Sequence, residues 1–378
     1  MNKTLRPEPE RQIHCFATST GIGGMERWLV SLTQQCLLHS IRISLRLATT
    51  PDTESVVAWF DRQGVKVCAD AAVPNNHQPQ SLHTMRAFAR LLRHTPPGIV
   101  NLHYGVAHIS LKDVLAVRLA GRRCVAAVHA ATPWSESGSG ARDSTRRAAL
   151  LCRTVIVHSR ATYEHLLEAG IPPSKIQIVP CGVPAPVQPP NREQARRQFD
   201  LKPETFVVAT VARLVHAKGV DDLITAVAEM PDGPEGVRLL IAGDGPARAE
   251  LEALAARLLG PRALFLGQVA DVNPVYAAAD VFALPSHMEG FGLVFLEAAH
   301  HQVPSVGTRV GGIPEVVIEG ETGLLTPVKD SQALAAALSR LRNDPGLRRQ
   351  MGQAAQRRVQ EEFSESATAE RYLHALQR

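Results

Sequence analysis

The sequence predicts an α/β fold with two Rossmann-like domains, each a parallel sheet with helices on both faces. Short apolar runs alternate with longer amphipathic segments through both halves of the 378 residues, and this strand–helix alternation is typical of parallel sheets. Hydrophobic residues make up 45% of the chain and aromatic residues only 4%, which suits helices packed on sheets. A chain of this length is too long for one ordinary domain and fits two.

The apolar runs place five strands in each half. In the first half we expect strands at 12–18, 41–48, 98–103, 123–128 and 154–158. In the second half we expect strands at 205–211, 237–242, 262–266, 280–284 and 303–307. Amphipathic segments such as 25–38 and 84–94 are expected to form helices between strands, and 344–378 is expected to be helical with no strand after it.

The segment GVPAPVQPPNREQ at 182–194 holds four prolines and predicts the connection between the domains. Proline fixes the backbone and has no N–H for a helix or a sheet ladder. We therefore expect an N-terminal domain at 1–183, a linker at 184–204 and a C-terminal domain at 205–360. Two such domains facing each other leave a cleft at the carboxyl ends of their strands, where ligands of these sheets bind.

The cysteines show no CxxC spacing, and several lie in apolar runs, which indicates buried free thiols in a reducing compartment and no zinc site. The six are Cys15, Cys36, Cys68, Cys124, Cys152 and Cys181. The first residues, MNKTLRPEPERQ, are not followed by the apolar run of a signal peptide, and no run of 18 apolar residues is present. These features predict a soluble cytoplasmic protein.

The net charge of +5 is unevenly distributed. Residues 1–183 hold 21 lysines and arginines against 12 acidic residues, whereas the remainder holds 20 against 24. A basic first half would favour an anionic partner or peripheral contact with an anionic membrane surface. An ordinary solvated basic surface is the alternative, since the sequence does not say whether these charges cluster. We expect no nucleic-acid partner.

A cationic loop, in TVARLVHAKGVDDL, follows the first strand of the second half. Arg213 can hold phosphate oxygens with its planar fork, and Lys218 adds a compact charge nearby. A helix is expected to start near Gly219, so a diphosphate at this strand end would also meet free backbone N–H groups. Two solvated cations in a loop are the alternative interpretation.

The second candidate segment, 285–304, places Glu289 in a loop and Glu297 about one turn into the following helix. Ionised carboxylates accept hydrogen bonds from sugar and ribose hydroxyls, so two acids with an anion pocket between them fit a nucleotide sugar. The alternative is a helix-capping Glu289 and a surface Glu297. Glycines that permit tight turns and the start of the helix lie between the two acids, at Gly290, Phe291, Gly292 and Leu293.

The first half offers a glycine loop and two histidines. Gly23 and Gly24, in GIGGMER, lie between a strand and a helix and form a plausible phosphate cradle, without the GxGxxG of dinucleotide binding. His103 and His129 each end an apolar strand and are expected to face the cleft. An imidazole there can stabilise charge or orient an acceptor. A hydrogen-bonded strand-end histidine is the alternative, above all for His103.

Taken together, R-x4-K and the E-x7-E of EGFGLVFLE resemble glycosyltransferase family 4, the retaining transferases of GT-B architecture. Further matches are GIGGMER at 21–27, AGDGP at 242–246, YAAADVFALPS at 276–286, GGIPEVV at 311–317 and GETGLL at 320–325. The closing FSESATAERYLHAL resembles the terminal helix of the family, so 361–378 is expected to pack back toward the N-terminal domain.

The resemblance implies that Arg213 and Lys218 hold the donor diphosphate, while Glu289 holds the donor sugar and Glu297 the ribose. It implies a donor-binding set that also includes Gly23, Gly24, Gly243, Gly290, Phe291, Gly292 and Leu293. It implies a catalytic set of His129, Arg213, Lys218 and Glu289, with His103 and His129 on the acceptor side. Ala130 stands where the family commonly has Asp, and 180–184 departs from the family pattern before the linker, which affects the acceptor side and the hinge.

The function implied is transfer of a hexose-type sugar from a UDP- or GDP-sugar to a glycan or lipid-linked saccharide in cell-surface polysaccharide synthesis. Protein cations would replace a metal, so we expect neither metal nor cofactor. We expect a cytoplasmic protein, peripheral on the inner face of the membrane if the basic half binds lipid. Alternatives are a nucleotide-sugar epimerase or isomerase of the same architecture, a non-catalytic nucleotide-sugar binding protein, and a nicotinamide dehydrogenase, which the missing glycine fingerprint disfavours.

Overall fold

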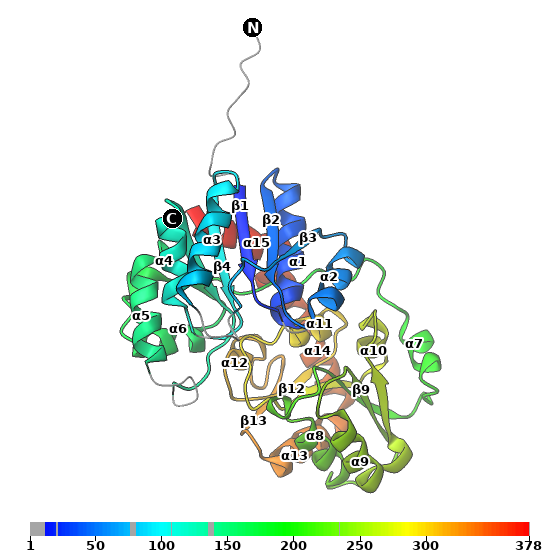
Figure 1. Ribbon diagram of the computed structural model, residues 1–378. Helices are drawn as coiled ribbons and strands as arrows, with labels where there is room; N and C mark the ends of the chain where they lie inside the picture. The colour runs from blue at the N-terminus through cyan, green and yellow to red at the C-terminus, as the bar shows by residue number, and fades with distance from the viewer. Residues whose placement is uncertain are drawn as a thin grey trace. The chain divides into compact units, whose positions relative to one another are not determined.

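Two separate parallel sheets organise the chain, one in each half. The computed structural model describes residues 12–19, 22–75, 81–106, 108–134, 140–233 and 235–377. Unit 1 comprises Met1–Gly182 and Glu365–Arg378, and unit 2 comprises Val183–Ser364. In each unit, helices flank a sheet of parallel strands (Figure 1). The predicted α/β class with two Rossmann-like parts is confirmed.

The described part of unit 1 forms a seven-stranded parallel sheet of order β3-β2-β1-β4-β5-β6-β7. Its strands are β1 (Gln12–Ala17), β2 (Arg42–Ala48), β3 (Val67–Asp70), β4 (Ile99–Tyr104), β5 (Arg123–Val128), β6 (Thr154–Val157) and β7 (Ile176–Ile178). Its helices are α1 (Gly24–Leu38), α2 (Thr53–Arg62), α3 (Leu82–His94), α4 (Leu111–Leu119), α5 (Ala141–Leu151), α6 (Arg160–Glu168) and α15 (Glu365–Gln377). All five expected strands are present, whereas β3 and β7 were not expected.

The described part of unit 2 forms a six-stranded parallel sheet of order β10-β9-β8-β11-β12-β13. Its strands are β8 (Phe206–Val211), β9 (Val237–Ala242), β10 (Ala263–Gly267), β11 (Val281–Leu284), β12 (Ser305–Thr308) and β13 (Gly323–Thr326). Its helices are α7 (Arg192–Gln198), α8 (Val220–Ala228), α9 (Arg248–Leu258), α10 (Asn273–Ala278), α11 (Leu293–His300), α12 (Ile313–Val316), α13 (Ser331–Asn343) and α14 (Pro345–Glu362). In both units the strand order reverses beside the first strand, which is the topological switch point where ligands of such sheets bind.

The segment expected to be a linker, 184–204, is structured in part and belongs to unit 2. Helix α7 lies inside it, and Asn191 Oδ1 accepts hydrogen bonds from the first N–H groups of this helix. Arg192 and Arg196 of α7 both form ion pairs with Asp280, at 2.8 and 3.4 Å. The proline-rich pattern indicated a connection, but it did not reveal that a buried arginine ties the following helix to the sheet.

The end of the chain also differs from the expected boundaries. Helix α14 runs to Glu362 within unit 2, so the returning segment begins at Glu365 and not at 361. Helix α15 then packs beside α1 in unit 1 (Figure 1). Trp28 of α1 and Tyr372 of α15 are both fully buried, with ring centroids 5.6 Å apart. This aromatic contact fixes the last helix in the core of unit 1.

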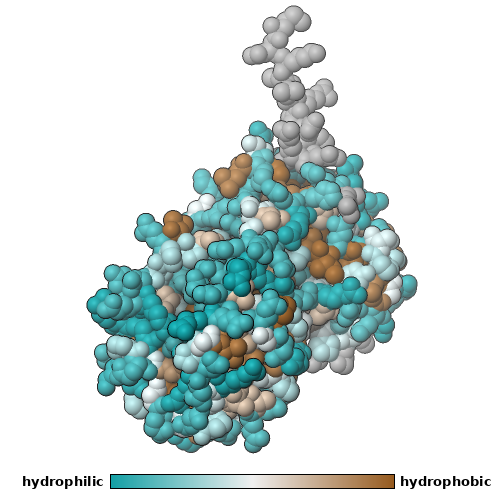
Figure 2. Space-filling model, turned by 180° about the vertical axis from the view of Figure 1, so that it is seen from behind, coloured by the Kyte–Doolittle hydropathy of each residue, from teal (hydrophilic) through white to brown (hydrophobic). Residues whose placement is uncertain are grey.

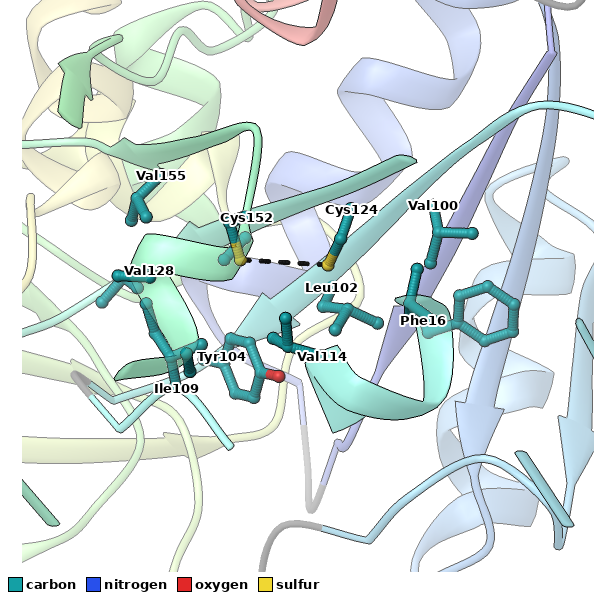
Figure 3. Close-up of a cluster of buried hydrophobic side chains, with 14 of the residues drawn as sticks. Phe16, Val100, Leu102, Tyr104, Ile109, Val114, Cys124, Val128, Cys152 and Val155 are labelled. Atoms are coloured by element: carbon teal, nitrogen blue, oxygen red, sulfur yellow. Dashed lines mark hydrogen bonds between the residues drawn. The ribbon is translucent and has the colours of Figure 1, made fainter. Parts of the chain in front are cut away.

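The core of unit 1 contains two of the cysteines. The sulfur atoms of Cys124 on β5 and Cys152, which follows α5, lie 3.9 Å apart as free thiols among apolar side chains (Figure 3). The contact with the Cys152 thiol, together with burial, raises the pKa of Cys124 well above its usual value, so its thiol stays protonated. All six cysteines lie in the described residues and are free, and only Cys68 is exposed. The expectation of buried free thiols therefore needs correction at Cys68 alone.

Within the part of the chain that the structure describes, no helix is both long enough and apolar enough to span a membrane. Large exposed apolar residues occur at scattered positions such as Leu119 and Val187. Figure 2 accordingly shows a face that is mostly hydrophilic, with separate hydrophobic spots. Residues 1–11, nearly all of the N-terminal segment in which no signal peptide is expected, lie outside the described residues.

Candidate functional site

The loop after β8 is held in place by the loop after β9. Leu214 N donates to Asp244 O at 2.9 Å, and Ala247 N donates to Leu214 O at 3.0 Å. Gly243 has φ +135°, and a Cβ there would lie 1.8 Å from Ala212 O. Gly243 therefore permits close contact between the two backbones, a packing role that the predicted donor-binding role did not include.

The loop after β11 holds the same β8 loop from its other side. His287 N donates to Ala217 O at 2.9 Å. Gly219 precedes α8 with φ +62°, and a Cβ there would lie 2.2 Å from Pro285 O. The cationic loop is therefore fixed at the switch point between β8 and β11, where the first turn of α8 leaves backbone N–H groups without helical partners.

The structure brings Lys218 and Glu289 into direct contact at this switch point. Lys218 Nζ donates to Glu289 Oε2 at 2.8 Å, and the two side chains are only 24% and 14% exposed. Glu289 Oε1 accepts from Gly290 N at 3.1 Å. A Cβ on Gly311 would lie 1.7 Å from Glu289 O, so the β12 loop packs directly on this backbone. The lysine expected to hold the diphosphate and the carboxylate expected to hold the sugar are thus paired with each other.

Arg213 belongs to the same loop but is exposed, and its side chain has no hydrogen bond or ion pair to any described residue. Its charge is therefore not neutralised within unit 2. A guanidinium that is held by its backbone and free at its head can bind a phosphate in a bidentate manner. The loop consequently offers one free and one paired cation.

Helix α11 places Glu297 near the switch point. Gly292 caps the helix with φ +92°, and Glu297 Oε2 accepts from Tyr276 OH at 2.7 Å. Phe291 is buried, with its ring 5.8 Å from that of Phe363, and Leu293 is buried as well. The side chains of these two predicted donor contacts therefore belong to the core, so their contribution is limited to backbone N–H groups at the start of α11.

Three further ionisable side chains adjoin the cationic loop. His287 Nε2 and Asp222 Oδ2 are 2.7 Å apart, and Asp221 lies beside them, with one ligand atom of each residue within 4.8 Å of the others. This hydrogen bond orients the histidine against the N-terminal turn of α8 and already uses one of the possible metal-ligand atoms. That no metal is needed stays a prediction.

In unit 1, Gly23 and Gly24 are exposed at the start of α1. Gly23 N donates to Glu26 Oε2 at 2.8 Å, so its N–H is already engaged. Gly24 is the first residue of α1, where backbone N–H groups lack helical partners. The first glycine of the predicted GxGG cradle, Gly21, lies outside the described residues.

Three histidines meet at the carboxyl edge of the sheet of unit 1. His103 is the last residue but one of β4, His129 follows β5 and His158 follows β6. His103 Nδ1 and His129 Nε2 are 3.1 Å apart, and the rings of His129 and His158 have centroids 4.5 Å apart. The ring of Tyr372 lies nearly parallel to those of His103 and His158. These four side chains are called the histidine cluster below.

Burial sets the protonation of the cluster. It lowers the pKa of His103 to about 3 and that of His158 to about 4, and it lowers the pKa of His129 well below the usual value. In each case the loss of solvation of the cation is the largest cause. All three imidazoles are therefore neutral at pH 7.

The cluster should make unit 1 sensitive to acid. Between pH 6.5 and about 4 the unfolded chain binds protons at His103 and His158 that the folded chain does not bind. The free energy of unfolding therefore decreases as the pH is lowered, by about 1.4 kcal/mol per pH unit for each histidine. We expect His158→Asn to reduce this slope. Urea titrations at pH 7.0, 6.0 and 5.0 measure the free energy of unfolding and hence its slope against pH. Equal slopes for the native chain and the His158→Asn variant would contradict the conclusion that His158 is neutral in the folded chain.

Comparison with known proteins identifies the family. Residues 22–185 match the family described as Glycosyltransferase Family 4, and residues 191–358 match Glycosyl transferases group 1. A GDP-mannose-dependent alpha-(1-6)-phosphatidylinositol monomannoside mannosyltransferase of Mycolicibacterium smegmatis is 34% identical over 262 residues, which cover 66% of this chain and 68% of that protein. The chain belongs to glycosyltransferase family 4.

Other relatives of this family 4 chain match over a shorter length. The N-acetyl-alpha-D-glucosaminyl L-malate synthase of Bacillus anthracis is 34% identical over 180 residues, which cover 47% of this chain and 47% of that protein. The chain thus spans about half the length of this relative. Among solved structures, Anabaena HepE in complex with UDP and glucose has a TM-score of 0.81 at 23% identity, covering 97% of this chain and 99% of that one. The structural likeness extends over both units and supports the GT-B fold.

Sequence reasoning missed two members of the histidine cluster. His158 ends a strand that the sequence did predict, and a histidine at or next to the carboxyl end of three consecutive parallel strands was a usable signal. Tyr372 gave no comparable signal, because it comes from α15, far along the chain from the strands it contacts.

A buried carboxyl at the other switch point of this family 4 chain was also missed. A pocket between β1 and β4 is lined by residues that include Thr18, His103 and Asp113. Asp113 is buried on α4 and accepts from Tyr104 OH at 3.4 Å. Burial raises the pKa of Asp113 to about 7. No motif marked this residue.

Proposed function

We propose that this chain transfers a hexose-type sugar from a UDP- or GDP-sugar to a glycan or lipid-linked saccharide, with retention of the anomeric configuration. The observation that carries the proposal is the Lys218–Glu289 pair at the switch point of unit 2, where Lys218 shares its loop with the free Arg213. A nucleotide sugar contains what these groups bind, namely a diphosphate for the cations and hydroxyls for the carboxylate.

In this mechanism the enzyme acts through electrostatics. Arg213, Lys218 and the N-terminal turns of α8 and α11 stabilise the charge that develops on the departing diphosphate. Glu289 accepts hydrogen bonds from sugar hydroxyls, and Glu297 accepts hydrogen bonds from the ribose diol. To do so, Glu289 turns from Lys218 to the ligand and Glu297 turns from Tyr276 to the ligand. The departing phosphate takes the proton of the acceptor hydroxyl on the same face, so the new bond keeps the configuration of the old one.

Two observations bear on the acceptor. The relative from Mycolicibacterium smegmatis is named as a mannosyltransferase of a phosphatidylinositol monomannoside, which carries a sugar on a lipid. Residues 1–183 of this chain are rich in lysine and arginine, which suits an acceptor in an anionic membrane surface. Both support a lipid-linked saccharide, used in cell-surface polysaccharide synthesis at the cytoplasmic face of a membrane.

Incubating the full chain with UDP- and GDP-hexoses and a lipid-linked saccharide in anionic vesicles tests the proposal. We expect an acceptor-dependent product whose anomeric proton coupling in NMR matches that of the donor. Raising the salt concentration should reduce transfer in anionic vesicles more than in neutral ones, because ions screen surface attraction.

Each alternative gives a different product. An epimerase would convert the donor with no acceptor present, and a non-catalytic binding protein would bind the donor and leave it unchanged. An inverted product would refute retention while leaving donor binding intact.

A further inference from the structure

The hydrogen-bond partners of the histidine cluster determine where its protons lie. His158 Nδ1 is 2.8 Å from Val179 O. A carbonyl oxygen only accepts, so Nδ1 of His158 carries the proton and Nε2 is a bare lone pair. This Nε2 is buried with no partner among the described residues. This placement of the proton is the favourable one, because a buried nitrogen lone pair without a partner costs less free energy than a buried N–H without a partner.

The same reasoning applies to His103. Its Nε2 is buried and has no partner among the described residues, whereas its Nδ1 faces His129 Nε2 at 3.1 Å. A proton on Nε2 would be an orphaned donor, so the neutral ring places its proton on Nδ1. His103 therefore donates and His129 Nε2 accepts. Because His129 is neutral as well, its own proton is on Nδ1.

His129 is the half-buried member of this arrangement, and its Nδ1 has no partner among the described residues. Behind it the rings are fixed by packing. Tyr372 lies nearly parallel to His103 and His158, at 15° to each, and its hydroxyl accepts from Asn101 Nδ2 at 2.7 Å. The final helix of the chain thus closes the back of the cluster.

We infer that His103 is a positioning residue that fixes His129 in the Nδ1–H tautomer, so that His129 offers a hydrogen-bond donor, and not a base, to an oxygen atom of its ligand. The inference deepens the proposed function and rests on it only in taking that ligand to be a substrate. A donor in this position suits a sugar hydroxyl or phosphate oxygen and leaves removal of the acceptor proton to the departing phosphate.

Nitrogen-15 NMR of the full chain, labelled at its 15 histidines, tests this assignment without any substrate. Long-range proton–nitrogen spectra distinguish the two neutral tautomers, and single substitutions assign the signals. We expect His103, His129 and His158 all to be Nδ1–H in the native chain. A His129 signal of the Nε2–H type in the native protein would overturn the inference, whatever the variants do.

Two substitutions separate positioning from packing. His103→Leu removes the donor, and we expect His129 to move mainly to the Nε2–H tautomer and kcat to fall about tenfold with little change in the donor KM. His103→Asn keeps an N–H near the position of Nδ1, and we expect it to restore the Nδ1–H signal and most of kcat. An Nδ1–H signal for His129 in a folded His103→Leu protein would refute the role of His103.

The outcomes also separate this inference from the proposed function. If the tautomers are as expected and no sugar transfer is found with any donor, the proposed function fails and the proton assignment stands. If transfer is found and His129 is Nε2–H, the proposed function stands and the positioning role of His103 fails.

Discussion

Arg213→Ala should lower kcat/KM for sugar transfer by about 100- to 1000-fold, the usual effect of removing one group that stabilises charge in the transition state. Arg213 has the largest expected effect because it is the free cation of the loop, whereas Lys218 shares its charge with Glu289. Steady-state kinetics with the preferred donor measure the loss.

The matched control for this prediction is Arg257→Ala. Arg257 is another exposed arginine of unit 2, on α9, away from the switch point. We expect kcat/KM within about twofold of the native value in the control, with both variants unfolding at the native temperature. Native kinetics in the Arg213→Ala protein would remove the mechanism proposed above.

Glu289→Gln should have opposite effects on turnover and on nucleotide binding. Turnover should fall by about 100-fold, because the sugar loses a charged acceptor that acts in the transition state. Binding of the free nucleoside diphosphate should become a few-fold tighter, because Lys218 no longer has a carboxylate partner at 2.8 Å. Kinetics with the sugar donor and calorimetry with the diphosphate alone measure the two effects separately.

An exposed glutamate provides the control for the second prediction. Glu321 lies in the turn before β13 and is exposed, so Glu321→Gln removes the same charge from unit 2 at the amino end of a strand, whereas the site lies at the carboxyl ends. If both variants tighten nucleotide binding equally, the effect is one of net charge and not of the Lys218–Glu289 pair. Weaker diphosphate binding in Glu289→Gln would show that the carboxylate does not compete for Lys218.

The positions of the main site residues were predictable because parallel sheets have directional edges. The cationic loop and the loop that holds Glu289 each follow a strong apolar strand, and the carboxyl ends of neighbouring parallel strands meet at one edge. Arg213 and Glu289 could therefore be placed near each other from strand positions alone. The same rule would have placed His158 beside His129, had the three strand-end histidines been compared.

The pairings within the site were not predictable in the same way. That Lys218 bonds to Glu289, and Glu297 to Tyr276, depends on side-chain directions fixed by tertiary packing. Tyr372 reaches the histidine cluster only because α15 returns to unit 1. The short strands β3, β7 and β13 have three or four residues each, too few for an apolar pattern to stand out from a loop.

Binding of free UDP and GDP to the native chain and to an Arg213→Ala, Lys218→Ala double variant tests the central claim most directly, since it isolates the diphosphate site from sugar and acceptor. We predict that one nucleotide binds the native chain at a ratio of one to one and, at 100 times its Kd, stabilises it by about 2.7 kcal/mol. The double variant should bind it at least 100-fold more weakly. Equal affinity for the two proteins, or no binding of either nucleotide to the native chain, would contradict the account.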